Sequence, residues 1–333
     1  MTRSVPPRPL SVLLALGTCA ALLAGCGGSS GSASSGTSGQ SQGSGVTTLR
    51  VVYQPTATAL PALVAVDEGI FAKHKLDVTL TPASGLISQQ INALGHQFDV
   101  AMGTQPDLIR AAGNNLPVVE ISGGAVDSPD KPAVLLIAKA GSGISSLKDL
   151  VGKRVGSPSL SGNIHLATLN ALDKAGVDPS KVNFVEGGVP VLPDQLKAGQ
   201  VDAIECLQPY ANNLVSGGAV SLGDPFSSIA KDATINLWLA NKQWADGHKA
   251  QVQAWQAAMK EAAQFIESND AEARQVLKKY LKLPDQVVAS FPLQGFDFSL
   301  KPDELSTWLQ VMKKVGSFKG SVQAGKLVPS WAG

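Results

Sequence analysis

The fold is decided by the stretch Lys153-Arg154-Val155-Gly156-Ser157-Pro158-Ser159-Leu160-Ser161-Gly162-Asn163-Ile164-His165. It predicts a short strand that stops at Ser157, a turn of small polar residues, and a helix that begins near Ser161. Such a turn directs backbone N–H groups and hydroxyls to one point at a helix N-terminus, where partial positive charge suits a small polar or anionic ligand. An ordinary helix cap made by Ser159 or Ser161 explains the same pattern equally well.

Predicted strands and helices alternate on both sides of this stretch. This rhythm is typical of parallel sheets with helices on both faces, in which ligands bind beyond the carboxyl ends of the strands. The expected strands are Leu49–Gln54, Leu76–Thr81, Phe98–Met102, Leu116–Ser122, Ala133–Ala138, Val182–Val185, Val201–Ile204 and Thr234–Ala240. The other expected helices are Leu60–Phe71, one capped at Ser84, one that ends at Ala112, Leu192–Ala198, Ala250–Glu267, Ala271–Leu281 and Pro302–Val315.

A weak internal repeat indicates two lobes that are built alike. Gln97-Phe98-Asp99-Val100 and Gln200-Val201-Asp202-Ala203 each follow a predicted helix end and enter a strand. Gly199 suits the left-handed position at the helix end of the second copy, and His96 occupies the matching position of the first. The chain from Val46 onward is also longer than one ordinary core, which again favours two lobes.

The N-terminal segment has the features of an export signal. Arg3 and Arg8 precede the apolar run Leu10–Leu23, which is too short to span a bilayer as a helix. The run leads into Leu23-Ala24-Gly25-Cys26, which resembles the lipobox of bacterial lipoproteins, although a plain signal peptide with a chance cysteine is the alternative. We expect a protein anchored by lipid to the outer face of the cell membrane. Its expected parts are a signal peptide over 1–25, lipid attachment at Cys26, and a Gly/Ser linker over 26–47.

Composition argues against several kinds of site. Cys206 is the one cysteine in the expected folded part, so an internal disulfide or a cysteine-based metal cluster is not possible there. Without Arg3 and Arg8, the 27 basic residues fall to 25 against 26 acidic ones, a balance that argues against nucleic acid as a partner. The four histidines have no metal-ligand spacing. We expect a monomer without a metal or cofactor.

The expected folded part lacks the signatures of common hydrolases and redox enzymes. From residue 48 onward it contains no G-x-S-x-G, C-x-x-C or H-E-x-x-H motif. His165 lies one turn into the predicted helix, where a packing role is typical. We therefore expect a binding protein rather than an enzyme.

Several segments in both halves resemble one known family. They are Leu49-Arg50-Val51-Val52-Tyr53-Gln54, Glu68-Gly69-Ile70-Phe71, Lys75-Leu76-Asp77-Val78, Phe98-Asp99-Val100-Ala101, Leu147-Lys148-Asp149-Leu150-Val151-Gly152-Lys153-Arg154-Val155, Leu196-Lys197-Ala198-Gly199-Gln200-Val201-Asp202-Ala203 and Gln208-Pro209. Together they are similar to the nitrate/sulfonate/taurine-type substrate-binding proteins of ABC importers. That family shares its fold with the thiamine-pyrimidine precursor binders and synthases.

The resemblance implies a type II periplasmic-binding-protein fold, an α/β fold in which two lobes are joined by two hinge crossings. The crossings map to about Ala138–Gly143 and Thr234–Ala240. The implied divisions are a first part of lobe 1 over 48–138, lobe 2 over 139–234, and a return to lobe 1 with the C-terminal helices over 235–333.

The resemblance also implies a ligand-binding cleft between the strand ends of the two lobes. In lobe 1 it places Gln54, Thr56, Ser84, Gly103 and Thr104 there. In lobe 2 it places Ser157, Ser159, Ser161, Gly162, Asn163, Glu186, Glu205 and Tyr210 there. Trp238, at the second crossing, either stacks on a ligand ring or packs as a hinge residue.

The charges at these strand ends bear on the ligand. None of them offers Arg or Lys, whereas Glu186 and Glu205 each follow or end a strand. Carboxylates in the cleft favour an amine or hydroxyl donor, unless both glutamates point to solvent at the rim. We expect a small neutral or cationic nitrogen-containing nutrient, such as a heterocycle. A sulfonate- or nitrate-type anion stays open because helix N-termini hold oxyanions.

The expected function is capture of this nutrient and its delivery to an ABC permease and its ATPase. One alternative is an enzyme of the pyrimidine-precursor-synthase branch, whose cysteine-rich iron-binding run this chain lacks. Another is a sensory or adhesion lipoprotein on the same fold.

Overall fold

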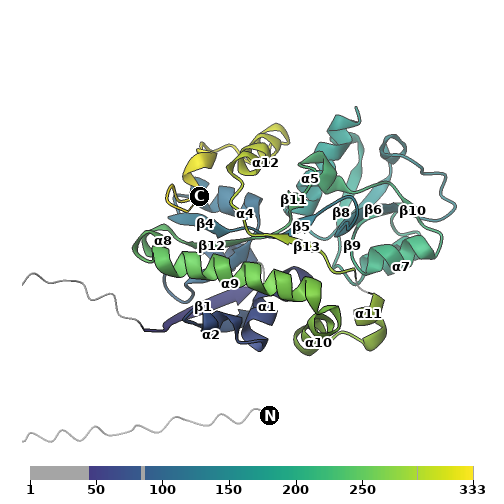
Figure 1. Ribbon diagram of the computed structural model, residues 1–333. Helices are drawn as coiled ribbons and strands as arrows, with labels where there is room; N and C mark the ends of the chain where they lie inside the picture. Colours follow the sequence, from purple (N-terminus) through teal and green to yellow (C-terminus); the bar gives the residue numbers. More distant parts are fainter. Residues whose placement is uncertain (1–44, 84–86, 291, 333) are drawn as a thin grey trace, which may run out of the picture. The chain divides into compact units, whose positions relative to one another are not determined.

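Two five-stranded sheets, with a three-stranded sheet between them, form the framework of the computed structural model (Figure 1). The structure describes residues 45–83, 87–290 and 292–332. The expected signal peptide, Cys26 and Ser84 lie outside the described residues. No helix in the described ranges is both long enough and apolar enough to cross a membrane.

The first sheet has the strand order β2-β1-β3-β12-β4 and forms the core of lobe 1. β1, β2 and β3 are parallel, whereas β12 runs antiparallel between β3 and β4. The Val, Leu and Ile residues of the central strands are buried on both faces, because helices cover both sides. The strands are β1 (Thr47–Tyr53), β2 (Leu76–Pro82), β3 (Val100–Gly103), β4 (Val118–Ser122) and β12 (Leu237–Asn241).

The helices of lobe 1 follow the prediction with one interruption. Gly69 adopts a left-handed conformation with φ +63°, so the helix expected over Leu60–Phe71 divides into two. The helices on one face are α1 (Leu60–Asp67), α2 (Ile70–Lys73), α9 (Lys249–Ser268) and α10 (Asp270–Leu281). Those on the other face are α3 (Ile87–Ile91), α4 (Gln105–Gly113) and α12 (Pro302–Lys314).

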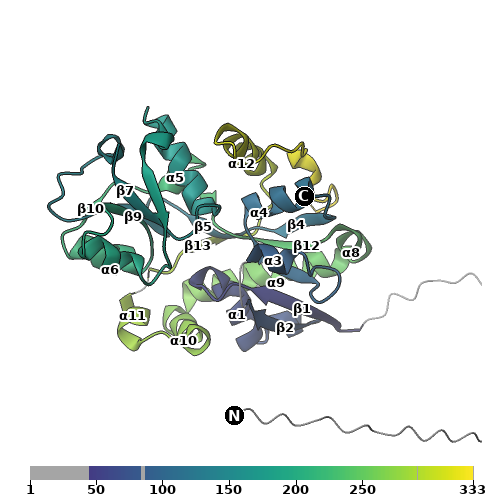
Figure 2. The ribbon, with the colours of Figure 1, turned by 180° about the vertical axis from the view of Figure 1, so that it is seen from behind.

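The second sheet has the order β10-β6-β9-β7-β8 and forms lobe 2. α5 covers one face of this sheet and α6 the other (Figure 2). Leu172 of α5 packs on the first face, and Leu196 of α6 and Leu214 of α7 pack on the second. Residues 153–165 fold as predicted, because β7 ends at Ser157 and α5 begins two residues after Ser161. The elements are β6 (Val134–Ala138), β7 (Arg154–Ser157), α5 (Asn163–Lys174), β8 (Asn183–Glu186), α6 (Leu192–Lys197), β9 (Ala203–Leu207), α7 (Tyr210–Ser216) and β10 (Val220–Ser221).

The internal repeat is visible as two matching side-chain clusters. The Arg50 guanidinium donates to the Asp99 carboxylate and to the His96 carbonyl. In lobe 2, the Arg154 backbone N–H donates to the Asp202 carboxylate, and the Arg154 guanidinium donates to the Gly199 carbonyl. Gly199 is left-handed as predicted, with φ +71°. In the first copy Gly95 takes that conformation, with φ +82°, so His96 does not have to adopt it.

The small third sheet carries the chain between the lobes and differs from the expectation in position. Its order is β11-β5-β13, with β5 (Gly124–Asp127), β11 (Ala233–Thr234) and β13 (Gly295–Asp297). The first crossing lies at β5, upstream of the expected Ala138–Gly143, because β6 pairs with β9 in the second sheet. The second crossing lies at β11, the first residues of the expected Thr234–Ala240; the rest of that run is β12 of the first sheet.

The other helices of the described chain are short. They are η1 (Ala57–Ala59), η2 (Leu147–Leu150), η3 (Pro179–Lys181), η4 (Pro225–Ser228), α8 (Lys242–Gly247), α11 (Asp285–Ser290) and η5 (Ala324–Lys326).

Candidate functional site

The turn between β7 and α5 presents small polar groups at the end of the second sheet. The hydroxyls of Ser159 and Ser161 lie 3.3 Å apart. Gly162 is the residue that caps α5, and no side chain caps this helix by a hydrogen bond. An ordinary cap made by Ser159 or Ser161 is therefore absent at this helix start. The turn keeps hydroxyls and a helix N-terminus available to a ligand.

Glu205 lies inside lobe 2 rather than in a cleft. Its side chain has no exposed area, one of its oxygens accepts from Ser157 Oγ at 2.6 Å, and the other lies 3.1 Å from His165 Nδ1. The His165 ring also packs edge-on against Phe184, with the ring centroids 4.4 Å apart. The expectation that Glu205 contacts a ligand therefore needs correction, because both of its oxygens bond within the lobe. His165 is thus buried inside the lobe, where its ring packs on Phe184 and its Nδ1 lies within hydrogen-bond distance of Glu205.

Glu186 serves the turn itself. Its side chain is exposed at the end of β8 and accepts from the Leu160 backbone N–H at 2.9 Å. This bond ties the tip of the turn to the neighbouring strand. Because Glu205 is internal and Glu186 bonds the turn, these two carboxylates no longer favour a cationic ligand.

Arg110 is a basic group at the site that the strand-end argument missed. From α4 of lobe 1, its Nη2 donates to the Ser161 carbonyl of lobe 2 at 2.8 Å. Its Nη1 lies 3.8 Å from Asp107, a carboxylate that accepts from Thr104 Oγ1 at 2.7 Å. Burial lowers the pKa of Arg110 although Asp107 opposes the shift, and burial raises the pKa of Asp107 against the opposing effects of Thr104 and Arg110. The sequence signal was an Asp and an Arg three residues apart, just after Thr104.

A hollow of about 270 Å³ lies beside this contact between the lobes. Its wall is about half polar and half apolar, and it carries both signs of charge because Asp107 and Arg110 both line it. Ser161 is the lining residue that belongs to lobe 2, and the other lining residues belong to lobe 1. The complete lining is Gln89, Ile91, Asn92, Asp107, Arg110, Ala111, Asn114, Leu116 and Ser161.

The strand ends of lobe 1 carry further polar groups. Gln54 follows β1, and its buried Oε1 has no hydrogen-bond partner. A buried acceptor without a partner is costly, so a ligand N–H or O–H there gains from the pairing. The hydroxyls of Thr56 and Thr58 lie 2.8 Å apart, and Thr104 caps α4 by accepting from the Asp107 N–H. Gly103 packs closely, because a Cβ there would lie 2.7 Å from Leu239 Cδ1.

The two aromatic residues predicted at the site, Trp238 and Tyr210, differ in their exposure to solvent. Trp238 is fully buried on the α9 side of β12 and packs edge-on against Trp255, with the ring centroids 5.2 Å apart. Stacking of Trp238 on a ligand is therefore excluded in this structure, and packing is its role. Tyr210, the first residue of α7, keeps 36% of its surface exposed and is free to contact a solute.

Asn163 is also engaged, although it was predicted to bind ligand. Its buried side-chain amide donates to the Ile235 carbonyl at the second crossing, at 2.8 Å.

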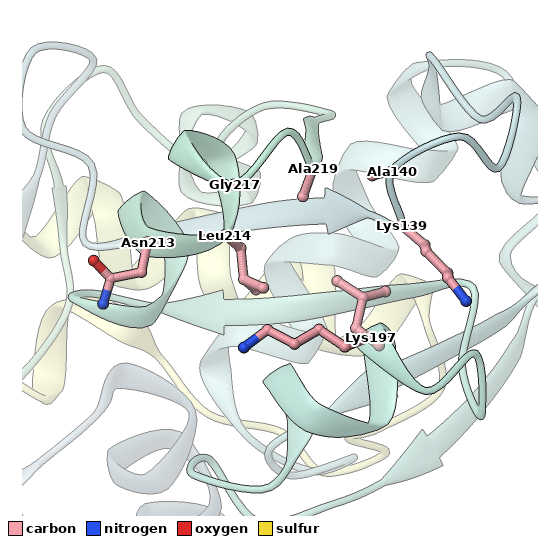
Figure 3. A pocket seen from close by; sticks show the side chains of 8 residues that line it. Lys139, Ala140, Lys197, Asn213, Leu214, Gly217 and Ala219 are labelled. Carbon is pink, nitrogen blue, oxygen red and sulfur yellow. The ribbon is translucent and has the colours of Figure 1, made fainter.

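A further hollow of about 250 Å³ lies between α6 and α7, with Lys139 and Lys197 beside Leu214 (Figure 3). Lys139 follows β6, which runs antiparallel to β9, so this hollow lies at the opposite end of lobe 2 from Ser157. Among the described residues, no group of three or more His, Cys, Asp or Glu side chains could hold a metal ion.

Much of the chain matches a known protein family. The family described as NMT1/THI5 like matches residues 56–273. The chain belongs to this NMT1/THI5-like family. Its relatives include the formylaminopyrimidine-binding protein of Halalkalibacterium halodurans, 28% identical over 84% of this chain and 82% of that one. The taurine-binding periplasmic protein of Escherichia coli is 27% identical over 77% of this chain and 75% of the relative.

Other similarities extend to the fold and to an enzyme. The periplasmic aliphatic sulphonate-binding protein of Escherichia coli superposes with a TM-score of 0.73 at 20% identity, over 85% of this chain and 97% of that one. The fold is thus the type II periplasmic-binding-protein fold, as the resemblance implied. The 4-amino-5-hydroxymethyl-2-methylpyrimidine phosphate synthase of Schizosaccharomyces pombe is 26% identical over 53% of this chain and 49% of its own length.

Proposed function

We propose that this NMT1/THI5-like protein is the extracytoplasmic substrate-binding component of an ABC importer. In this role it captures a small polar solute between its lobes and presents it to a membrane permease and its ATPase. The observation that carries the proposal is the contact between Arg110 and the Ser161 carbonyl, beside a hollow lined from both lobes. The relatives named as binding proteins for a formylaminopyrimidine and for taurine support it.

The solute we propose carries both hydrogen-bond donors and acceptors. Arg110 supplies positive charge, Asp107 supplies negative charge, and the side-chain Oε1 of Gln54 supplies a buried acceptor. This mixture supports a nitrogen-containing heterocycle, an amine, or a sulfonate-type solute that also has donors. The further contacts we propose are Thr56, Gly103, Thr104, Ser159, Ser161, Gly162 and Tyr210.

A hinge rotation about the crossings is the motion we propose for capture. β5 and β11 are short paired strands that carry the chain between the two sheets. Short element ends of this kind absorb the backbone changes of lobe closure. The bound solute would hold the turn after β7 against α4, and the closed form would be the one that the permease recognises.

A solute screen tests this proposal. The soluble part, residues 46–333, is purified, and its melting temperature is measured with formylaminopyrimidine, taurine, an alkanesulfonate without an amine, and nitrate. Titration calorimetry and small-angle scattering then follow any hit, and light scattering gives the oligomeric state. We expect one solute to bind one monomer and to make it more compact.

Two results would contradict the proposal. Failure of every solute in a broad nutrient screen to shift the melting temperature would favour the sensory or adhesion alternative. Chemical conversion of a bound solute by the purified protein would favour the synthase alternative.

Membrane attachment through Cys26 is a separate proposal that rests on the sequence. Cells that express the full chain with a labelled fatty acid should incorporate the label, and Cys26→Ala should abolish it. Cys19→Ala is the matched control, because Cys19 lies within the expected signal peptide. Absence of label from the wild-type protein would leave the plain signal peptide as the explanation, and unchanged labelling of the Cys26→Ala protein would place the lipid at another residue.

A further inference from the structure

Two consecutive carbonyls of the second crossing are held by side-chain amides from opposite lobes. Gln105, the first residue of α4 in lobe 1, donates from Nε2 to the Thr234 carbonyl at 2.9 Å. Asn163, the first residue of α5 in lobe 2, donates from Nδ2 to the Ile235 carbonyl at 2.8 Å. The crossing therefore lies between the starts of two helices, one from each lobe.

On the lobe 1 side, Glu304 accepts further hydrogen bonds from the crossing and from Gln105. Glu304 of α12 accepts from the Thr234 backbone N–H at 2.9 Å and from Thr234 Oγ1 at 3.0 Å. It also accepts from Gln105 Nε2 at 3.1 Å. Gln105, Thr234 and Glu304 each keep less than a tenth of their surface exposed. Breaking such bonds leaves buried polar groups without partners, which is costly.

On the lobe 2 side, Asn163 uses both ends of its amide. While Nδ2 holds the crossing, Oδ1 accepts from the Ile164 backbone N–H at 3.0 Å, which ties the amide to the start of its own helix. The crossing is in turn attached to β5, because the Ile235 N–H donates to the Ala125 carbonyl and Asn236 Oδ1 accepts from the Ala125 N–H. These bonds thus connect the start of α5 to the segments of both crossings.

We propose that Gln105 and Asn163 are positioning residues that set the angle between the lobes and couple it to solute capture. This inference rests on the proposed function and adds to it the residues that connect the site to the hinge. Thr104 directly precedes Gln105, and Gly162 directly precedes Asn163, so each amide is one residue away from a proposed solute contact. A solute that draws the two helix starts together moves the crossing through these amides.

The experiment measures the distance between the lobes in protein without solute. Spin labels are placed at Glu267→Cys on α9 and at Lys148→Cys on η2, two exposed positions in opposite lobes. The labelled protein comprises residues 46–333, whose native cysteine Cys206 is buried and has its pKa raised to about 12 by burial, so we expect this thiol to react far more slowly with the label than the exposed ones. Double electron–electron resonance spectroscopy then gives the distribution of distances between the two spin labels.

The test variant is Asn163→Asp, which keeps the oxygen that Ile164 uses but puts a carboxylate oxygen against the Ile235 carbonyl. Asn170→Asp is the matched control. Asn170 lies on the same helix, is equally buried, and donates at 2.9 Å to the Ser228 carbonyl within lobe 2. We expect both variants to lose thermal stability, and Asn163→Asp alone to shift or broaden the distance distribution.

A second variant covers the case in which Asn163→Asp does not fold. Gln105→Met keeps the size of the side chain and removes the donor to Thr234, so it should broaden the distribution in the same way. A wild-type distribution in the folded variants, or an equal shift in Asn170→Asp, would overturn the proposal. Because no solute is present, this result stays independent of the solute screen, which decides the proposed function by itself.

Discussion

At the scale of single residues, Arg110 connects α4 of lobe 1 to the turn after β7 by its bond to the Ser161 carbonyl. The side chain is partly buried, which lowers its pKa, yet the group stays charged at any ordinary pH. A guanidinium of this kind offers several donors, and the carbonyl uses one of them. Nη1 also lies 3.8 Å from Asp107, and we propose that the donors left over bind an anionic or carbonyl-bearing part of a solute.

Replacement of Arg110 should therefore weaken binding. Hydrogen bonds to a charged group contribute about 1.5–3 kcal/mol, so Arg110→Gln should raise the dissociation constant of the identified solute about tenfold or more. Titration calorimetry measures this change. Arg154→Gln is the control, because Arg154 pairs with Asp202 in lobe 2 and does not line the hollow. Equal affinities of Arg110→Gln and the wild type would remove Arg110 from the site.

Glu120 should make the stability of the protein depend on pH. Burial raises the pKa of Glu120 from its usual 4.5 to about 8, Glu304 adds to the shift, and Lys301 opposes it. The folded state thus holds a proton that the unfolded state releases near pH 4.5. The stability that this proton provides is complete below about pH 4 and is lost as the pH rises to about 8.

Glu120→Gln removes this dependence, because the amide stays neutral at every pH. Relative to the wild type, the variant should gain roughly 2 kcal/mol or more in unfolding free energy at pH 9 compared with pH 5. Urea unfolding at the two pH values measures the difference. A constant difference between the two proteins from pH 5 to pH 9 would show that Glu120 has an ordinary pKa.

The sequence could predict where some residues of the candidate site lie and not others, for a physical reason. Thr104, Ser159 and Gly162 follow strands, and the ends of parallel strands meet at one edge of a sheet, so their positions follow from the order of elements. Glu205 and Trp238 lie within strands, where the direction of a side chain depends on which face a helix covers. The spacing of apolar residues does not reveal that choice, and Arg110 was missed because it projects from the second turn of a helix.

At the scale of elements, β12 and α9 pack through their tryptophans. Trp238 of β12 contacts Trp255 of α9, and Trp255 stacks on Phe71 with the ring centroids 5.0 Å apart. This cluster lies on the face of the first sheet opposite to α4, because α4 and α9 cover different faces. Its role is therefore to fix the sheet and not to contact a solute.

Trp238→Phe tests this assignment. The indole N–H of Trp238 has no hydrogen-bond partner, so the substitution should cost only the lost packing, about 1–3 kcal/mol of unfolding free energy. Calorimetric unfolding measures the loss, and titration should give the same solute affinity within about twofold. A marked loss of affinity at unchanged stability would place the indole in the binding site after all.

Long periodic elements could be predicted at this scale, and short ones could not. The helices α9, α10 and α12 were found within one or two residues because their apolar stripes are long. β5 and β13 have four and three residues, so they carry too little pattern to be recognised. β6 was found as a strand, but its apolar run fits either sheet, and this is why the first crossing was expected too late.

At the scale of the whole molecule, one apolar core joins the two lobes beside the crossings. Leu166 of α5 belongs to the same cluster as Leu108 of α4 and Trp308 of α12. Phe226 packs edge-on against Trp308, with the ring centroids 6.1 Å apart, and Lys314 pairs with Asp173 across the same contact. The lobes are therefore one unit in terms of stability, although each has its own sheet.

The two lobes should unfold in a single transition. All five tryptophans lie at residue 238 or beyond and none lies in lobe 2, so their fluorescence reports on lobe 1, whereas far-ultraviolet circular dichroism reports on both lobes. Urea unfolding followed by the two signals should give coincident curves, because the shared core couples the lobes. Fluorescence and dichroism curves with different midpoints would show that the lobes unfold separately.

The position of β12 bears on how a growing chain becomes a finished protein. β12 lies between β3 and β4, although the whole of lobe 2 separates it from them in the sequence. A nascent chain that ends before residue 237 therefore leaves a gap in the middle of its first sheet, with unpaired strand edges on both sides. Synthesis of about seven tenths of the polypeptide has to precede completion of that sheet, so the early part stays incompletely folded while translation proceeds.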